Sequence, residues 1–461
     1  MPRTALDPPI AHGGRDVDAT RTIASSLPVA LRMSTSDSHD GPIAVIGAGV
    51  IGCAVAYALA REGRPVLLID RAAPGEAGAS YGNVGHLATE LVEPLPSPGL
   101  LFGFWRELYA LGGPLDVPVR RLGAFAPWAR RFAMAAFRRR AHTQHLAPLV
   151  RPAGAAYAQL LAEIGREDLL RRNGHYQFWL SAKGAAQATA EARHMQALGI
   201  PTAPVAPDVL ANVRTAAGAQ HAAGLWFPES GHMLDPQAVC QALAHAAAAR
   251  GAQLRQLTVR SLEPEGERIA ITTADERFSV PAAVVCAGAW SAPLLAPFGL
   301  HAPLEAAYGY HVELPDEAAY VDAPALYADQ KILVTPMRGR LRASGYMEFG
   351  GLDGAPDPRK PARLRSQLAA LGYRCAADGP SWRGPRPVLP DYLPGIGRAP
   401  GAAPLYYAVG HQHLGLTLAP ATADLIADLV AARTPRQDLK SFDLSRFGSP
   451  SRQRPSIRAT P

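Results

Sequence analysis

Cysteine is scarce in this sequence, and no two cysteines lie at metal-binding spacing. Only four occur in 461 residues, and no C-x-x-C pair is present. Zinc ribbons, thioredoxin-type redox pairs and disulfide scaffolds all need closely spaced or numerous cysteines. We therefore expect no metal site, and any electron chemistry must come from a bound cofactor. The four residues are Cys53, Cys240, Cys286 and Cys375.

Long apolar runs and a strong charge excess are missing too. No run reaches the ~18 apolar residues that a membrane-spanning helix needs, so we expect a cytoplasmic protein that is at most peripheral on the inner membrane. Lysine and arginine number 46 against 39 acidic residues, which gives a net charge of +7. This mild excess suits anionic ligands but is far below the dense basic stripe of a nucleic-acid-binding protein.

The composition is that of a folded protein with more than one domain. Hydrophobic residues make up 48% and charged residues 18%, which excludes a mainly disordered chain. A length of 461 residues allows two or three domains. Residues 1–40 show no periodicity and lack the apolar stretch of a secretory signal, so we expect a disordered leader. The polar residues 445–461 predict a loose tail.

A β-α-β unit opens the ordered part of the chain. Residues 43–46 predict a short buried strand, and the following helical pattern ends at Gly63. Residues 66–69 predict a second buried strand that closes at Asp70. The helical crossover implies that the two strands are parallel.

The turn of this unit carries a G-x-G-x-x-G dinucleotide-binding fingerprint. Gly47 permits the tight turn, Gly49 lets the backbone approach a pyrophosphate, and Gly52 lets the helix pack close to the strand. The helix N-terminus at Val50 and Ile51 offers free N–H groups to the phosphates. Asp70 is placed to hold both ribose hydroxyls and disfavours NADP. The fingerprint does not distinguish NAD from FAD, but the absence of a second one favours a dehydrogenase that receives electrons from its own organic substrate.

Further elements follow the same patterns. Asp235 before Pro236 predicts an N-cap and a helix to about residue 250. The strand 282–286 runs into a turn at Ala287, Gly288 and Trp290, where small residues let the backbone approach the dinucleotide again. The sequence also predicts a helix-rich segment over 100–170, strands over 253–260, 268–273, 308–314, 331–335, 340–346 and 404–409, and a helix over 415–432.

Four more stretches resemble motifs of one known family. They are S-Y-G-N-V-G-H at 80–86, Y-G-Y at 308–310, G-P-R-P-V-L-P-D at 384–391 and G-H-Q-H-L-G-L-T at 410–417. From about residue 43 to 447 the chain resembles the FAD-dependent D-amino-acid oxidoreductase superfamily, and most closely its bacterial D-amino-acid dehydrogenase small-subunit type. Two departures fall where a substrate would sit: Tyr308 stands where relatives often have Lys or Arg, and His86 replaces a residue that is often neutral.

The resemblance implies an α/β fold with a discontinuous Rossmann-like, doubly wound FAD-binding domain and a discontinuous mixed-sheet α+β substrate domain. The FAD-binding domain would gather 41–95, 231–297 and 376–435, and the substrate domain 96–230 and 298–375. Val259, at the end of a strand, would meet the adenine through its backbone. The expected FAD contacts are Gly47, Gly49, Val50, Ile51, Gly52, Asp70, Arg71, Ser80, Asn83, Gly85, His86, Leu87, Val259, Ala287, Gly288, Trp290, Gly410, His411, Leu414, Gly415, Leu416 and Thr417.

The reaction implied by the resemblance is deamination of a D-amino acid by hydride transfer from the α carbon to flavin N5, with D-proline or D-hydroxyproline as candidate substrates. Arg386 would hold the substrate carboxylate with its planar fork, unless it pairs with Asp391 instead. Tyr308 and Tyr310 share one face of a strand, and one hydroxyl would join Arg386 or close the pocket, unless both simply pack. His86 would hydrogen-bond the flavin, touch substrate or bond FAD covalently.

Several alternatives stay open. The chain could be a glycine- or sarcosine-type amine oxidase that uses O2, a flavin-binding subunit of an electron-transfer complex, or a nicotinamide-linked dehydrogenase. Arginines cluster at 120–140 with Trp128, Phe132 and Phe137 among them. Such a segment could rest on an anionic membrane and pass electrons to a respiratory quinone, or it could be a surface helix with snorkelling arginines.

Overall fold

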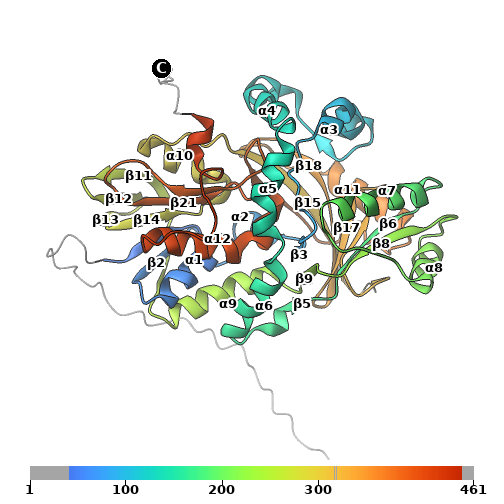
Figure 1. Ribbon diagram of the computed structural model, residues 1–461, viewed down its shortest axis with the longest axis horizontal. Helices are drawn as coiled ribbons and strands as arrows, with labels where there is room; N and C mark the ends of the chain where they lie inside the picture. Colours follow the sequence, from blue (N-terminus) through green and yellow to red (C-terminus); the bar gives the residue numbers. More distant parts are fainter. Residues whose placement is uncertain (1–40, 316, 318, 449–461) are drawn as a thin grey trace, which may run out of the picture. The chain divides into compact units, whose positions relative to one another are not determined.

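The computed structural model describes residues 41–315, 317 and 319–448 (Figure 1). The expected leader, 1–40, and residues 449–461 of the expected tail lie outside this range. Within it, two large β-sheets organise the chain, and both mix distant segments of the sequence. The α/β fold class predicted from the sequence is confirmed.

The first sheet has six strands in the order β10-β2-β1-β14-β21-β20. The predicted β-α-β unit is present at its centre, where β1 and β2 are parallel and joined by α1. All neighbours in the sheet are parallel except β20 and β21. Its strands are β1 (Ile43–Ile46), β2 (Val66–Asp70), β10 (Gln253–Gln256), β14 (Ala282–Val285), β20 (Gly395–Arg398) and β21 (Leu405–Val409).

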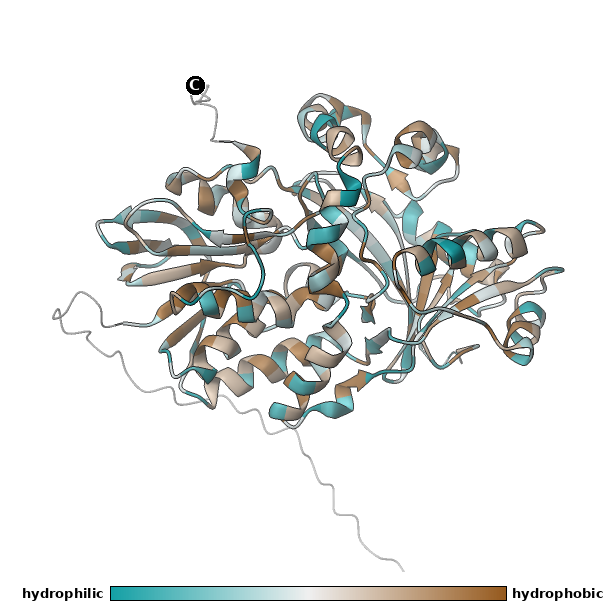
Figure 2. Ribbon diagram, in the orientation of Figure 1, coloured by the Kyte–Doolittle hydropathy of each residue, from teal (hydrophilic) through white to brown (hydrophobic). Residues whose placement is uncertain are grey.

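Both faces of this sheet are covered, which explains why its strands are continuous apolar runs. Alternate side chains point to opposite faces, so Val45 and Leu68 pack against α1 (Val50–Arg61), α9 (Pro236–Ala248) and α12 (Gly415–Val430). The intervening residues pack against a three-stranded antiparallel sheet on the other face. Figure 2 shows the apolar character of α1 and α12. The small sheet consists of β11 (Val259–Glu265), β12 (Arg268–Thr273) and β13 (Arg277–Val280).

The strand predicted over 253–260 is two strands in the structure. Residues 253–256 pair with β2 in the large sheet, whereas Val259 begins β11 in the small one. The chain changes sheets between them, and the Leu257 N–H donates to the Asp70 carbonyl at the edge of β2. Val259 therefore opens a strand instead of ending one.

The second large sheet is mixed and has the order β19-β15-β18-β17-β16-β6-β8-β7, with β4 also paired to β18. Helix α11 (Arg359–Ala370) packs on β15 and β18, and α7 (Gly184–Ala197) packs on β6 and β8. Strand β19 pairs with β15 here, although its residues fall in the range 376–435 expected in the FAD-binding domain. The strands are β4 (Leu115–Asp116), β6 (His175–Trp179), β7 (Ala203–Pro204), β8 (Ala223–Phe227), β15 (Glu305–Pro315), β16 (Ala325–Tyr327), β17 (Ile332–Met337), β18 (Arg340–Glu348) and β19 (Ser381–Val388).

The helix-rich middle segment is present as expected, and so is the cap at Asp235. The Asp235 side chain accepts a hydrogen bond from the Ala238 N–H at 3.1 Å, with Pro236 in the first turn of α9. No helix of the described residues is both long and apolar enough to cross a bilayer. The remaining elements are α2 (Gly78–Tyr81), α3 (Pro98–Gly103), α4 (Leu122–Ala136), α5 (Arg139–Val150), α6 (Ala153–Glu163), α8 (Pro207–Ala216), α10 (Ser291–Leu295), and a small sheet of β3 (His86–Leu87), β5 (Leu170–Arg171) and β9 (Gly231–Met233).

Candidate active site

A cavity of about 610 Å³ is lined by residues of both large sheets and by the first turns of α1 and α12. Most of the expected FAD contacts line it. Five of the expected contacts are not among the lining residues: Gly52, Gly85, Leu87, Leu414 and Thr417. Those that line it are Gly47, Gly49, Val50, Ile51, Asp70, Arg71, Ser80, Asn83, His86, Val259, Ala287, Gly288, Trp290, Gly410, His411, Gly415 and Leu416.

Glycine is required at two fingerprint positions by the backbone itself. Gly47 has φ +108°, and a Cβ there would lie 2.5 Å from the Cys286 carbonyl oxygen. A Cβ on Gly52 would lie 1.7 Å from the Gly47 carbonyl oxygen. Any side chain at Gly52 would therefore push α1 away from the turn and its N-terminus away from the cavity.

The N-terminal turn of α1 has polar groups suited to a pyrophosphate. The Val50 N–H donates to Ser80 Oγ at 3.0 Å, and this hydroxyl lies beside Gly49. Asp70 Oδ2 accepts from the Ala48 N–H at 2.6 Å, and Oδ1 accepts from the Ala72 N–H at 3.1 Å. A carboxylate has about four acceptor positions, so two stay free for hydroxyl groups. The turn therefore fits a bound dinucleotide.

Arg386 lies on β19 with its guanidinium directly over Gly309. A Cβ on Gly309 would be 2.1 Å from Arg386 Nη2, so any side chain at this position would collide with the guanidinium. Nη1 donates to the Tyr346 carbonyl oxygen at 3.3 Å. Among the described residues no carboxylate lies within ion-pair distance of Arg386, because Asp391 pairs instead with Arg446 at 2.7 Å. Burial lowers the pKa of Arg386, as expected for a charge that faces a cavity without a protein counter-ion.

Of the two tyrosines that flank Gly309, Tyr310 is among the residues that line the cavity and Tyr308 is not. They share a face of β15, but it is the face opposite to Gly309 and Arg386, since side chains alternate along a strand. The Tyr308 hydroxyl donates to the Leu352 carbonyl at 3.1 Å, and the Tyr310 hydroxyl donates to Glu348 Oε2 at 2.5 Å. Neither hydroxyl therefore meets Arg386 as predicted, whereas the alternative that one of the tyrosines closes the pocket stays a prediction.

Trp382 forms a wall of the cavity that the sequence analysis missed. Its ring lies against two glycines, since a Cβ would come within 2.0 Å of it at Gly82 and 1.7 Å at Gly384. The ring also stacks on His311, with centroids 5.2 Å apart. Spacing offered a signal, because residues 382, 384 and 386 of one strand must share a face. Trp382 and Arg386 therefore bound one side of the cavity.

Two histidines stand before the N-terminus of α12. His411 Nε2 is 3.0 Å from Thr422 Oγ1, and burial lowers its pKa to about 3. Burial also lowers the pKa of His413 to about 4, and the nearby Arg386 charge contributes. Both imidazoles are therefore neutral at pH 7. Thr417 does not face the cavity; its Oγ1 accepts from the Ala88 N–H at 3.1 Å and ties α12 to the loop after β3.

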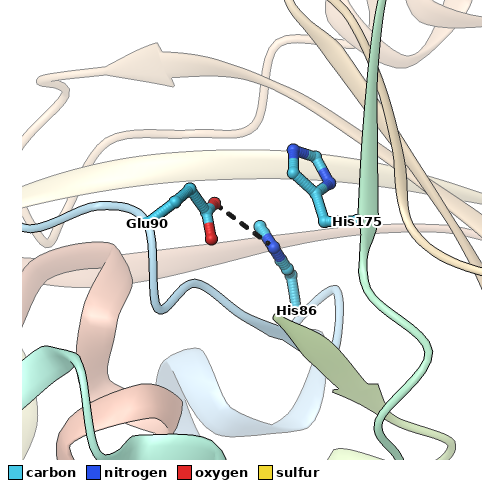
Figure 3. A group of neighbouring side chains, drawn as sticks. All are labelled: His86, Glu90 and His175. Atoms are coloured by element: carbon cyan, nitrogen blue, oxygen red, sulfur yellow. Dashed lines mark ion pairs between the residues drawn. The ribbon is translucent and has the colours of Figure 1, made fainter. Parts of the chain in front are cut away.

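His86, which also lines the cavity, belongs to a buried polar group with Glu90 and His175 (Figure 3). Its Nε2 is 3.4 Å from Glu90 Oε1, and its ring lies 4.4 Å from the ring of His175. Burial lowers the pKa of both histidines to about 3. The sequence analysis missed Glu90 and His175, which have no common periodicity with His86.

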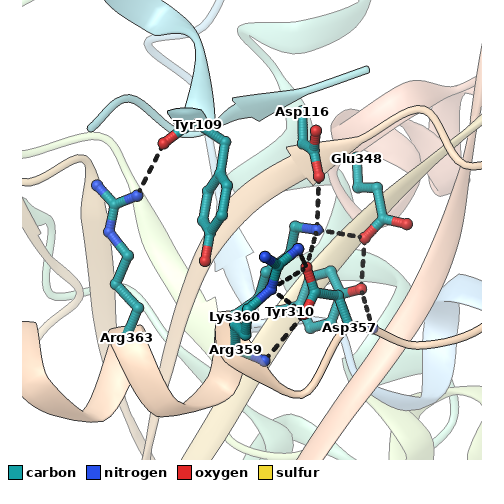
Figure 4. Close-up of polar contacts among 8 residues, drawn as sticks. All are labelled: Tyr109, Asp116, Tyr310, Glu348, Asp357, Arg359, Lys360 and Arg363. Atoms are coloured by element: carbon teal, nitrogen blue, oxygen red, sulfur yellow. Dashed lines mark hydrogen bonds and ion pairs between the residues drawn. The ribbon is translucent and has the colours of Figure 1, made fainter. Parts of the chain in front are cut away.

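A second buried polar group lies behind β15, on the side away from Arg386 (Figure 4). Lys360 on α11 is 1% exposed and pairs with three carboxylates. Its Nζ is 2.7 Å from Asp116, 2.9 Å from Glu348 and 3.2 Å from Asp357. Because Glu348 also accepts a hydrogen bond from the Tyr310 hydroxyl, this cluster joins α11, β4, β15 and β18. Burial, followed by the Glu348 hydrogen bond, raises the pKa of Tyr310 to about 12.

Comparison with known proteins finds relatives that are similar in sequence over most of the chain. It is 32% identical to a D-amino-acid oxidase of Bradyrhizobium diazoefficiens, over 88% of this chain and 98% of the relative. It is also 32% identical to D-amino acid dehydrogenase 2 of Ralstonia nicotianae, over 88% of this chain and 100% of the relative.

Solved structures share the fold. Glycine oxidase from Geobacillus kaustophilus matches with a TM-score of 0.69 at 22% identity, over 88% of this chain and 98% of that one. L-proline dehydrogenase from P. horikoshii matches with a TM-score of 0.65 at 17% identity, over 89% and 98%. The family model described as FAD dependent oxidoreductase matches residues 42–429. The chain therefore belongs to the DAO family of FAD-dependent oxidoreductases, and FAD is its cofactor.

Proposed function

We propose that this protein is a dehydrogenase that oxidises a D-amino acid, with Arg386 binding the substrate carboxylate. The observation that carries the proposal is a guanidinium that faces the cavity and has no carboxylate partner among the described residues. A planar fork of N–H donors binds a carboxylate in two places at once. Relatives named D-amino-acid oxidase and D-amino acid dehydrogenase support this substrate class.

The chain contributes binding, orientation and exclusion of water. Bound FAD supplies a two-electron acceptor for the hydrogen on the substrate α carbon. Arg386 fixes the carboxylate, and the Trp382 ring closes one side of the cavity. The α1 turn and Ser80 would hold the pyrophosphate, while the first N–H groups of α12, at Gly415 and Leu416, would stabilise negative charge on the reduced ring.

The wall near Arg386 favours a compact or cyclic apolar substrate, so D-proline and D-hydroxyproline are the first candidates. Leu333, Tyr346, Met347 and Trp382 line the cavity from the same sheet as Arg386 and offer mainly apolar surface. We assign residues 41–95, 231–297 and 376–435 to the FAD-binding domain. We assign residues 96–230 and 298–375 to the substrate domain, whose sheet also includes β19 because that strand pairs with β15.

An anaerobic titration tests the proposal directly. The purified yellow protein should bleach when a D-amino acid is added, and D-proline should reduce it about 10²-fold faster than L-proline, because Arg386 and Trp382 fix which face of the α carbon meets the flavin. Stopped-flow absorbance measures both rates. Faster reduction by glycine or sarcosine, with rapid reoxidation by O2, would favour the amine oxidase instead. Failure of every amino acid to bleach the protein would leave only the electron-transfer subunit.

For the electron acceptor we propose a quinone reached from an anionic membrane surface. Residues 98–137 carry several strongly exposed apolar side chains, including Phe102 at 81%, Val119 at 82% and Phe137 at 73%. Trp128, by contrast, is buried against Phe349, so the surface differs from the helix face expected from the sequence. The other exposed apolar residues there are Phe104, Trp105, Leu111, Leu122 and Met134. Exposed arginines within or directly after this range are Arg106, Arg120, Arg130, Arg138 and Arg140.

Apolar and basic side chains on one surface match the interface of an anionic bilayer. Sedimentation should recover the protein with phosphatidylglycerol vesicles and not with phosphatidylcholine vesicles. The double variant Phe102→Ser and Phe137→Ser should reduce binding about tenfold, since each buried aromatic adds apolar area. Leu254→Ser, an exposed apolar position on β10, is the matched control. Equal binding of wild type and double variant would contradict the proposal.

A further inference from the structure

The group formed by His86, Glu90 and His175 brings three metal-binding side chains together from β3, the loop after it and β6. Figure 3 shows the Glu90 carboxylate directed toward the His86 imidazole, with the His175 imidazole beside it. One donor atom from each side chain lies within 4.8 Å of both others. Glu90 and His175 are buried, and His86 is largely enclosed. The protein thus presents two nitrogen donors and one carboxylate oxygen in the interior.

Neighbouring groups orient these donors as they do around protein-bound metals. His175 Nδ1 is 3.2 Å from the Pro324 carbonyl, and since a carbonyl can only accept, Nδ1 carries the proton and Nε2 keeps its lone pair. Glu90 Oε2 accepts from the Ser230 hydroxyl at 2.5 Å, which leaves Oε1 for another partner. Metal-bound histidines commonly donate their second N–H to a carbonyl, and bound carboxylates are hydrogen-bonded too.

The charges around Glu90 are a second, independent indication that a cation binds here. Glu90 is 5% exposed, and no lysine or arginine of the described residues lies within ion-pair distance of it. Its ion-pair contact is with His86, whose buried Nε2 has no hydrogen-bond partner in the described part of the chain. A buried carboxylate without a cation is costly, and so is a buried nitrogen without a partner. One cation between them would remove both costs.

We propose that His86, Glu90 and His175 bind one zinc ion, with water as the fourth ligand. Two imidazoles and a carboxylate are a ligand set that zinc accepts. Tetrahedral bonds of about 2.0–2.2 Å separate the donors by about 3.3–3.6 Å, and His86 Nε2 and Glu90 Oε1 are already 3.4 Å apart. The ion ties the loop after β3 to β6, and so fixes one wall of the FAD cavity to the second large sheet.

The metal content of the purified protein tests this. The full chain, produced in zinc-supplemented medium with a purification tag that lacks histidine, should contain about one zinc per chain by plasma mass spectrometry. Glu90→Gln and His175→Gln should each lower zinc below about a tenth per chain, because each removes a ligand. His221→Gln, which changes an exposed histidine, is the matched control and should keep the ion.

Cobalt gives a second, spectroscopic readout, and its wild-type arm does not depend on how well the variants fold. Wild-type protein loaded with Co²⁺ alone should show d–d absorption at wavelengths beyond the flavin bands, and His175→Gln should not. Less than about a tenth of a zinc per wild-type chain after reloading with Zn²⁺, or stoichiometric iron or manganese in its place, would overturn the assignment. Zinc that persists in both folded variants would overturn it as well. None of these outcomes depends on which substrate the enzyme oxidises.

Discussion

Arg386→Leu is expected to lower kcat/KM for the best D-amino acid by about 10²–10⁴-fold. A bidentate carboxylate contact comprises two charge-assisted hydrogen bonds of about 1.5–3 kcal/mol each. Arg386→Lys should retain part of the binding, because lysine keeps the charge but not the planar fork. Steady-state kinetics measures both, and most of the loss should fall on KM.

The thermal stability of these variants separates binding from folding. Arg386 has no acid partner among the described residues and its pKa is lowered by burial, so Arg386→Leu should leave the melting temperature unchanged or raise it. Arg383→Leu is the matched control from the same strand, because Arg383 stacks on the Tyr308 ring at 3.5 Å on the opposite face. It should lower stability slightly and leave KM unchanged. An unchanged KM in Arg386→Leu would end the carboxylate-binding role.

Lys360→Met is expected to destabilise the protein by about 3–5 kcal/mol, because it leaves Glu348, Asp116 and Asp357 without their shared cation. Methionine preserves much of the side-chain volume, so the loss reports the charge and not a cavity. Urea unfolding, followed by tryptophan fluorescence, measures the change.

A neighbouring ion pair supplies the control for this experiment. Arg359 precedes Lys360 on α11 and also pairs with Asp357, at 2.9 Å, but its side chain is 78% exposed. Arg359→Met should therefore cost at most about 1 kcal/mol, as exposed ion pairs do. Equal effects of the two substitutions would mean that the buried cluster does not hold β15 and β18 together (Figure 4).

Features encoded by neighbouring residues were predicted from the sequence. The fingerprint glycines have a steric cause within one turn, and the parallel strands are recognisable because burial on both faces makes them continuously apolar. The Asp235 cap is equally local. These patterns gave the β-α-β unit, α9, α12 and the central strands with small errors at their ends.

Features that depend on strand register were not predictable in the same way. Sequence spacing correctly put Tyr308 and Tyr310 on one face, but which face meets Arg386 depends on how β15 pairs with β19, where Ala307 lies opposite Arg386. Glu90 and His175 come from segments far apart in the chain, and so do Lys360 and its partners Asp116 and Glu348. No periodicity marks such residues, since tertiary packing alone brings them together.

The strand order of the six-stranded sheet has a consequence for synthesis of the chain. β1 ends at Ile46, but its inner neighbour β14 begins only at Ala282, and β21 beyond that at Leu405. During translation, the edge of β1 that pairs with β14 stays unpaired until β14 has been synthesised. An unpaired apolar strand exposes the nascent chain to aggregation. Chaperone binding during translation should therefore persist until the last strands have left the exit tunnel.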